Sequence, residues 1–443
     1  MEQVQTKFHT LKNFSQIISI IETNFKTTTF MNNQKTIETH STEEKLNPAV
    51  NTMGHAYSIL SSSPLFNLSL SSKELFHSNF LAWLAQHYPD FFVEICKELG
   101  CKADWSNAEW NVKREYKNFD LCITSDEKIV MVLENKVKSI PTKAQLDEYV
   151  EKLKKKKKQD VKNIDLILLS LSTSFPDKNA IEGEKKWQIR NYDHLCTAMR
   201  EHMQLINNQY HKALIEDYCS FVATLHECSE SWKVKDSSPF LLPNDSNRKE
   251  LKELRIADLQ DKIWYSQLLE KLNSRLEENN QWDVQSGMDI KKIAKDNSAC
   301  LTKIFTNFGF THVEGLLEAK IKVSQDYVLL IQIQGNKYCR AIEWIKEDQG
   351  DHNKFWEMTK DIMNKKGFSF FQFKKNDPIN FPSICNNEKT IKYTTRYGET
   401  RNFNKYGSKF LYQYKVIKED ATVSAVLDAI MKDLASIKEA FKN

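Results

Sequence analysis

The sequence lacks any apolar run long enough to cross a membrane, and its first residues, Met1-Glu-Gln-Val-Gln5, lack the basic and apolar regions of a signal peptide. Nine cysteines are scattered along 443 residues and never form Cys-x-x-Cys, which favours reduced thiols over disulfides or a zinc site. Only nine prolines are present and 40% of residues are hydrophobic, which excludes a mainly disordered chain. We therefore expect a soluble, cytoplasmic protein with no membrane partner.

An excess of one charge is also missing. The formal net charge of +4 is too small to prove a nucleic-acid partner and does not oppose one. The length allows two or three domains, and the sequence leaves a homo-oligomer open. We expect a peripheral helix and polar linker at 1–50 that the core does not need, a main domain at 51–245, a connecting helix at 246–280, and an α+β domain at 281–443.

Hydrophobic periodicity from residue 71 onward predicts the order α-β-β-β-α-β, after a preceding helix. The expected helices are Ser71 to Leu84, Pro89 to Leu99 and Pro141 to Lys157, and the expected strands are Trp110–Lys117, Phe119–Thr124, Lys128–Glu134 and Asn163–Leu171. Later in the chain, we expect helices at Tyr192–Leu205, Tyr210–Glu230, Asn247–Glu277 and Val423–Phe441, and strands with a Gly335-Asn336 turn within Gly315–Trp344.

The most informative stretch lies at the ends of two successive predicted strands. Asp120 opens one strand of a predicted hairpin, and Glu134-Asn135-Lys136 closes the next. A hairpin brings such residues together at one sheet edge, where two carboxylates repel unless a cation lies between them. Hard oxygen ligands suit Mg²⁺, with Mn²⁺ as an alternative ion. Lys136 shares a strand face with Glu134 and could orient a water or stabilise charge on a phosphate.

Glu-x-Lys alone is weak evidence for such a site. The tripeptide also occurs at Glu43, Glu184 and Glu318, so it arises by chance. Glu134 differs because a β-branched, apolar run precedes it, as in a buried strand. The competing interpretation is a strand-end ion pair with no further role.

The element order, with Asp120 on the second strand and Glu134-x-Lys136 on the third, resembles the core of the PD-(D/E)XK nuclease superfamily. Phe119-Asp120 stands where the superfamily has Pro-Asp, which leaves the carboxylate in place. Further similarities are Glu74 on the first helix, within Glu74-Leu-Phe-His77-Ser78, and the Gln145-x-x-x-Tyr149 spacing of the exonuclease-type branch.

The resemblance implies a restriction-endonuclease-like α/β fold, with a mixed sheet between helices, and metal-dependent hydrolysis of phosphodiesters, in DNA rather than RNA. It implies Glu74, Asp120, Glu134 and the Asn135 carbonyl as Mg²⁺ ligands, and Lys136, Gln145 and Tyr149 as catalytic-site residues. We expect a role in bacterial defence or DNA processing.

Other interpretations stay open at this point. Glu74 suits a helix N-terminus electrostatically, Gln145 and Tyr149 suit a core-facing helix stripe, and His77 and Ser78 suit packing. The whole fold could also be a catalytically silent nucleic-acid-binding or protein-interaction module, or a different metal-dependent hydrolase.

Five consecutive lysines end the helix that follows Lys136. Lys154, Lys155, Lys156, Lys157 and Lys158 could contact a phosphate backbone, or form a solvated helix end. A second basic segment, 392–415, mixes cations with aromatics, which would suit base stacking and phosphate contacts, although cross-strand pairing in a sheet is the better interpretation.

Overall fold

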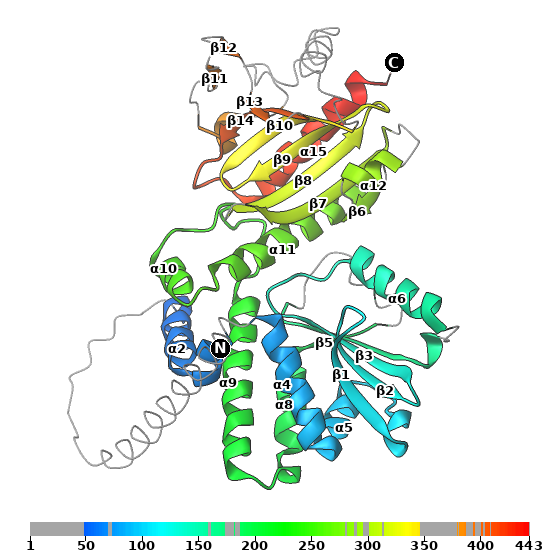
Figure 1. Ribbon diagram of the computed structural model, residues 1–443. Coiled ribbons are helices and arrows are strands. Elements are labelled where there is room, and N and C mark those ends of the chain that lie inside the picture. Colours follow the sequence, from blue (N-terminus) through cyan, green and yellow to red (C-terminus); the bar gives the residue numbers. More distant parts are fainter. Residues whose placement is uncertain are drawn as a thin grey trace, which may run out of the picture. The chain divides into compact units, whose positions relative to one another are not determined.

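The computed structural model describes residues 48–69, 73–157, 161–172, 181, 187–279, 281–287, 290–295, 301–311, 314–345, 379, 381–386, 393–394, 400–401, 404–407 and 409–442. From Pro48 onward the chain forms one compact unit, which contains two large sheets (Figure 1). Of the peripheral helix and polar linker expected at 1–50, residues 1–47, which include the amphipathic stretch Leu11–Phe25 and the polar stretch Thr27–Asn47, lie outside the described residues.

The first sheet has the strand order β1-β2-β3-β4-β5. The first three strands pair antiparallel, and β3, β4 and β5 pair in parallel, so the sheet is mixed. Its strands are β1 Trp110–Tyr116, β2 Phe119–Ser125, β3 Lys128–Lys136, β4 Asp165–Ser170 and β5 Gln188–Asn191.

Side-chain alternation divides this sheet between two cores. Leu133 and Leu169 face a large core under several helices, whereas Val132 and Leu168 face a smaller core closed by α6. Figure 1 shows these helices on opposite faces of the sheet. The helices of this region are α2 Pro48–Ser62, α3 Pro64–Leu68, α4 Glu74–His87, α5 Pro89–Glu98, α6 Lys143–Lys157, α8 Tyr192–Glu201 and α9 Gln209–Ser231.

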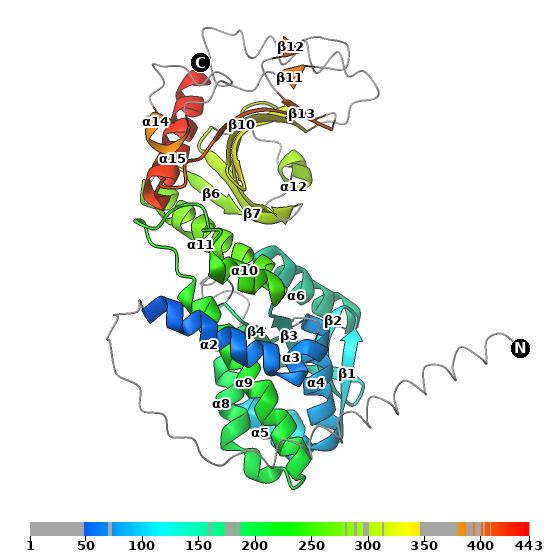
Figure 2. The same cartoon turned by 90° about the vertical axis from the view of Figure 1, so that its left-hand side faces the viewer.

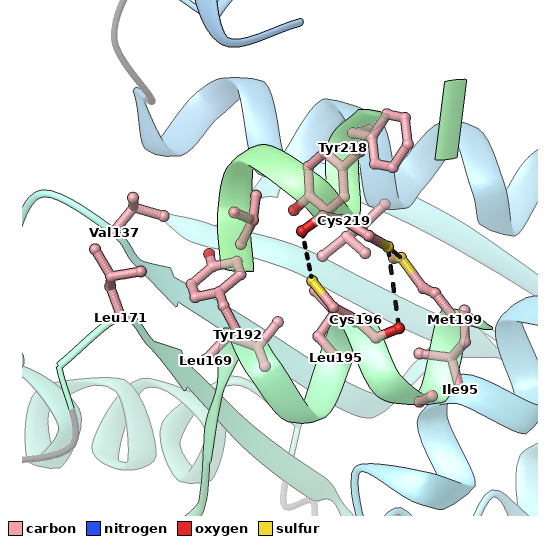
Figure 3. Packing of buried hydrophobic residues seen from close by; sticks show 14 of the residues in the cluster. Ile95, Val137, Leu169, Leu171, Tyr192, Leu195, Cys196, Met199, Tyr218 and Cys219 are labelled. Carbon is pink, nitrogen blue, oxygen red and sulfur yellow. Dashed lines mark hydrogen bonds between the residues drawn. The ribbon is translucent and has the colours of Figure 1, made fainter. Parts of the chain in front are cut away.

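Figure 3 shows how α8 and α9 pack beside the sheet. The Sγ of Cys196 on α8 donates to the carbonyl of Cys219 on α9 at 3.6 Å, and the Sγ of Cys219 donates back to the carbonyl of Cys196 at 4.0 Å. All eight cysteines among the described residues are free and buried, and burial raises the pKa of several of these thiols. None of the helices described is long and apolar enough to span a bilayer.

The second sheet has the strand order β13-β14-β10-β9-β8-β7-β6. Helices α11 and α15 pack against one face of this sheet, and the short helix α12 packs against the other, inside the curve of the sheet (Figure 2). A two-stranded sheet pairs β11 with β12. The elements are α10 Ser246–Glu253, α11 Ala257–Glu278, β6 Asp283–Ser286, α12 Ile290–Lys295, β7 Lys303–Thr311, β8 Glu314–Lys322, β9 Tyr327–Gln334, β10 Lys337–Trp344, α14 Phe381–Ile384, β11 Tyr393–Thr394, β12 Thr400–Arg401, β13 Asn404–Tyr406, β14 Phe410–Val416 and α15 Val423–Ala440.

The expected α/β fold is confirmed: the α-β-β-β-α-β core is present, and an α+β region follows it. The single helix expected at Asn247–Glu277 is wrong. The chain breaks between α10 and α11, where Arg255 adopts a left-handed backbone conformation with φ of 58°. Glycine usually marks such a break, and a left-handed arginine is uncommon, so no residue type in the sequence signals it.

Several other elements differ from the expectation. Helix α4 begins at Glu74, with Lys73 at its N-cap and no side-chain cap, while Ser71 and Ser72 lie outside the described residues. Helix α6 begins two residues after Pro141. The strands β5, β6 and β7 and the helices α2 and α3 were not anticipated; the two four-residue strands are too short to show a periodicity. The predicted domain boundaries stay a prediction.

Because α2 begins at Pro48, the best truncation point is there. A chain that starts at Pro48 should unfold within about 3 °C of the full-length chain, since the polar part of the removed segment, Thr27–Asn47, has little apolar surface to bury. A chain that starts at Ser63 loses Met53, Ala56 and Leu60 from the main core and should melt at least about 5 °C lower. Equal losses in both truncations, measured by calorimetry, would show that residues before Pro48 stabilise the fold.

Candidate active site

The acidic residues Asp120 and Glu134 lie on neighbouring strands at one end of the first sheet. Leu121 on β2 pairs with Leu133 on β3, so continuing the antiparallel register places Asp120 opposite Glu134. Their side chains share the face that α6 covers, since both alternate with residues of the main core. The expected juxtaposition of the two carboxylates is therefore present, and on a largely buried face.

Lys136 lies on the same face, two residues after Glu134. Its Nζ donates a hydrogen bond to Glu134 Oε1 at 2.7 Å, and both side chains are almost fully buried. Burial alone would lower the pKa of Lys136, but the carboxylates of Glu134, Glu74 and Asp120 together raise it. Lys136 is consequently a fixed cation at this edge of the sheet over the whole physiological pH range.

Asp120 is held differently. Its Oδ2 accepts a hydrogen bond from the backbone N–H of Asn135 at 2.8 Å. Burial, followed by repulsion from Glu134, raises the pKa of Asp120 to about 6, against the opposing effects of that hydrogen bond and of Lys136. Near neutral pH such a carboxylate is mostly ionised, and its negative charge is only partly neutralised by nearby groups. Carboxylates with this property are common among metal ligands.

The side chain of Asn135 points to the face of the sheet opposite α6, where its hydrogen bonds hold the end of β3 in place. Its Nδ2 donates to Ser78 Oγ on α4 at 2.8 Å, and its Oδ1 accepts from the Tyr192 hydroxyl on α8 at 3.0 Å. The side-chain amide is thus occupied by structural contacts. The backbone N–H and C=O of a strand residue point to the same neighbouring strand. Since the Asn135 N–H donates to Asp120 on β2, the Asn135 carbonyl also points toward β2.

His77 packs next to these residues, against the ring of Tyr192. It is fully buried and lies 2.9 Å from the Tyr218 hydroxyl through Nδ1. Burial lowers the pKa of His77 to about 3, so the ring is neutral at physiological pH. The packing role weighed for His77 and Ser78 from the sequence agrees with these contacts.

Gln145 and Tyr149 reach the carboxylate pair from α6. The Gln145 Nε2 donates to the Tyr149 hydroxyl at 2.9 Å, and this hydroxyl donates to Glu134 Oε1 at 3.1 Å. Burial, and then the nearby Glu134, raise the pKa of Tyr149 to about 12, so the hydroxyl keeps its proton. One oxygen of Glu134 therefore receives two donors, from Lys136 and Tyr149, which fixes the orientation of the carboxylate.

Glu74 does not join the pair directly in this arrangement. Its Oε1 accepts hydrogen bonds from both the backbone N–H and the hydroxyl of Ser139, the third residue after Lys136. Over the ranges that the structure describes, there is no group of three or more His, Cys, Asp and Glu side chains close enough to hold a metal ion. Ser139 was not anticipated as a contact, since a serine after a strand carries no distinctive signal.

The pair itself fits a divalent cation. The Oε2 of Glu134 is buried and has no hydrogen-bond partner among the residues that the structure describes, although the other oxygen has two. An unpartnered, buried carboxylate oxygen is costly unless a ligand satisfies it. Together with Asp120 and the Asn135 carbonyl, it provides hard oxygen donors of the kind that Mg²⁺ and Mn²⁺ prefer.

The five-lysine run lies at the far end of α6. Lys154 is exposed and pairs with Glu151 at 2.8 Å. The side chains of Lys155, Lys156 and Lys157, and the whole of Lys158, lie outside the described residues. In the segment 392–415, strand β14 pairs antiparallel with β10, in agreement with the cross-strand interpretation, and Tyr412 stacks on Tyr414 of its own strand.

Comparison with known proteins agrees with this geometry. Residues 65–220 match a family model described as the PD-(D/E)XK nuclease superfamily. The match begins in α3 and ends in α9, so it includes Glu74, Asp120, Glu134 and Lys136, and it confirms the resemblance seen in the sequence over this region. The matched region contains no part of the second sheet. No curated protein and no solved structure matches the chain.

The raised pKa of Asp120 makes stability depend on pH in a defined direction. Because its folded pKa of about 6 exceeds the ordinary value of 3.8, the folded state holds the proton more tightly. As the pH rises from about 4 to 6, ionisation of Asp120 therefore lowers the free energy of unfolding. Asp120→Asn should stabilise the metal-free protein at pH 8 by on the order of 1–2 kcal/mol, after allowance for solvent screening.

Urea unfolding in EDTA at pH 8 and pH 4.5 measures this effect. The difference between Asp120→Asn and wild type should shrink toward zero at the lower pH, where the wild-type carboxyl is largely protonated. Asp420→Asn, a substitution of an exposed carboxylate, serves as the control. If the difference in unfolding free energy between Asp120→Asn and the wild type did not change with pH, the raised pKa would not belong to Asp120.

Proposed function

Because residues 65–220 match the PD-(D/E)XK nuclease superfamily, we propose that the chain is a metal-dependent deoxyribonuclease whose site is formed by Asp120, Glu134 and Lys136. The observation that carries the proposal is the buried Glu134 Oε2, which has no partner among the described residues. Glu134 lies across from Asp120 in the strand register, and Lys136 contacts its other oxygen. A sheet end that served only for packing would not keep two carboxylates and an ammonium together under a helix. The proposed role is in bacterial defence or DNA processing.

The proposed ligand set is Asp120, Glu134 and the Asn135 carbonyl, with Glu74 as a further carboxylate. A bound Mg²⁺ or Mn²⁺ would supply an acidified water and charge stabilisation for the phosphate. For Glu74 to contribute, its carboxylate must leave Ser139 or use the oxygen that Ser139 does not contact. Such a change is small, since both Ser139 bonds go to one oxygen.

The other residues act on the carboxylates or on the substrate. Lys136, held by Glu134, places a permanent ammonium where negative charge develops on the scissile phosphate, so its contribution is greatest in the transition state. Tyr149 and Gln145 act as positioning residues: their hydrogen-bond chain fixes the Glu134 carboxylate from α6. Ser78 and Tyr192 fix the Asn135 amide from the other face and thereby hold the backbone of the strand end.

The most direct test of activity is nicking of supercoiled plasmid with Mg²⁺, with Mn²⁺ in parallel. Glu134→Gln and Lys136→Ala should each lower the cleavage rate at least about a hundredfold. Lys136→Ala should still bind DNA with affinity close to wild type, because its interaction strengthens mainly in the transition state.

Each variant is first checked for folding by its melting temperature. EDTA should abolish nicking by the wild type. Equal nicking by wild type and Glu134→Gln would show that the cleavage comes from elsewhere or from a contaminant. A wild type that binds DNA and never cleaves it would favour the silent binding module instead.

Substrate grip should be separable from chemistry by changing the five-lysine run. Replacing Lys154 to Lys158 with glutamine should weaken DNA binding. The slope of the logarithm of the binding constant against the logarithm of the salt concentration should become shallower by about one unit for each phosphate that is no longer neutralised. Single-turnover cleavage at saturating DNA should stay within about threefold of wild type, because the proposed metal ligands are unchanged.

A matched control replaces Lys97 and Lys102, exposed cations near the opposite, amino end of the parallel strands. There, the Ala103 N–H contacts Asp165 at the start of β4, far along that strand from the residues beside Lys136. The control should leave both affinity and salt dependence unchanged. An unchanged salt dependence in the five-lysine variant would assign that run to a solvated helix end.

A further inference from the structure

The inner face of the second sheet changes character along its length. Where α12 covers it, the sheet presents apolar residues: Phe305, Val328, Leu330 and Ala341 pack together with Ile293 of the helix. Beyond α12, the same face borders a cavity of about 600 Å³, with Glu318, Gln332 and Glu343 among its lining residues. A volume of this size suits a small ligand.

The floor of the cavity is a buried network of charges. Lys320 Nζ lies 3.2 Å from Glu318 Oε2 on its own strand and 2.9 Å from Glu343 Oε2 on β10. Gln332 Nε2 donates to Glu318 Oε1 at 2.9 Å. Glu318 and Lys320 are only 6% and 5% exposed. Taking these charges out of water opposes folding, and apolar residues would fill the same face more favourably, as they do under α12.

This network is unlike the first site, although both contain Glu-x-Lys on a buried strand. In the first site an oxygen of Glu134 has no partner, whereas both oxygens of Glu318 accept hydrogen bonds or an ion pair. Lys320 already lies between the two carboxylates of the second network. The second network therefore does not need a metal ion, and it leaves acceptor capacity on two fixed carboxylates.

Aromatic side chains and cations complete the cavity. Tyr406, Phe410 and Tyr412 supply rings, and Tyr406 is 69% exposed, so its ring meets solvent when no ligand is bound. Lys337 and Lys409 also line the cavity. The cavity thus combines hydrogen-bond acceptors on its floor with flat apolar surfaces and two ammonium groups.

We propose that this cavity binds a guanine nucleotide, with the base against the aromatic side chains and the phosphate near Lys337 and Lys409. Aromatic side chains stack on nucleobases, and fixed side chains recognise the base edges by hydrogen bonds. Guanine presents two adjacent N–H donors on its Watson–Crick edge, which match the acceptors of Glu318 and Glu343. Uracil presents carbonyl oxygens on both sides of its one donor, and these would repel a carboxylate.

A simple organic cation fits the cavity less well. Lys320 already neutralises one of the two floor carboxylates, and the two lining lysines would repel a second cation. The nucleotide can come from two sources with the same chemistry: a free nucleotide, or a guanosine within a single strand.

The experiment uses the full chain with Glu134→Gln in EDTA, so that cleavage does not interfere and the result does not depend on the proposed nuclease function. Titration calorimetry measures the binding of GMP, UMP, an all-uridine pentanucleotide and the same strand with one central guanosine. We expect at least one guanosine probe to bind about tenfold more tightly than its uridine match.

Two further variants locate the site. Tyr406→Ala should weaken guanosine binding roughly tenfold by removing a stacking surface, while Tyr210→Ala, an equally exposed tyrosine on α9, should change nothing. Glu318→Gln should reduce the preference for guanosine over uridine to about threefold or less. Because Tyr406 is exposed, its replacement should leave the melting temperature unchanged, which separates binding from folding.

Saturable binding of GMP with the affinity of the guanosine strand identifies a free nucleotide as the ligand, and binding of the strand alone identifies a base within a polynucleotide. The proposal is overturned if neither guanosine probe saturates the protein. It is equally overturned if Tyr406→Ala and Glu318→Gln both leave guanosine binding as it was.

Discussion

The end of the first sheet depends on one electrostatic constraint: two carboxylates are held side by side in a largely buried place, with a single ammonium to offset them. Lys136 contacts Glu134 directly, whereas Asp120 accepts a hydrogen bond from the backbone N–H of Asn135, and burial raises the pKa of Asp120. The surrounding elements hold this arrangement in place. Helix α6 brings the Tyr149 hydroxyl to Glu134, and α4 and α8 clamp the intervening Asn135 from the opposite face. A divalent cation would relieve both the repulsion and the unpartnered Glu134 oxygen, as expected for the proposed metal site, where binding is favoured at the expense of stability.

Much of this could be predicted because the signals are local. The strand ends at Asp120 and Glu134, and the helix face of Gln145 and Tyr149, follow from periods of two and of about 3.6 residues. The contacts that could not be predicted join residues without a pattern. Ser139 takes up the Glu74 carboxylate, and the sequence around it carries no sign of that contact. Arg255 breaks a helix in a conformation that usually marks glycine or asparagine. The strands β5 and β6 are four residues each, too short for an alternating pattern to be recognised.

The two Glu-x-Lys strands show how far a tripeptide can inform a functional assignment. Both pairs are buried on a strand, and in both the neighbouring carboxylates raise the lysine pKa despite burial. Their partners differ, however: Glu134 faces Asp120 and keeps an oxygen unpartnered, whereas Lys320 bridges Glu318 and Glu343 on separate strands. The tripeptide at Glu318 looked like a chance occurrence in the sequence because Glu343 is brought to it only by sheet pairing. The chemistry therefore depends on the residues that the fold adds to the motif.

The central claim is that Asp120 and Glu134 are kept together in order to hold a divalent cation, and Mn²⁺ binding followed by electron paramagnetic resonance tests it most directly. Free Mn²⁺ gives a strong signal that disappears on binding, so the titration counts sites without any need for substrate or turnover. We expect saturable binding to the wild type and at least about tenfold weaker binding to Asp120→Asn and to Glu134→Gln. Tyr149→Phe, which removes one hydrogen bond to Glu134 and no proposed ligand, should weaken binding less. The same Mn²⁺ isotherm for the wild type and for the Asp120→Asn, Glu134→Gln double variant would contradict the claim.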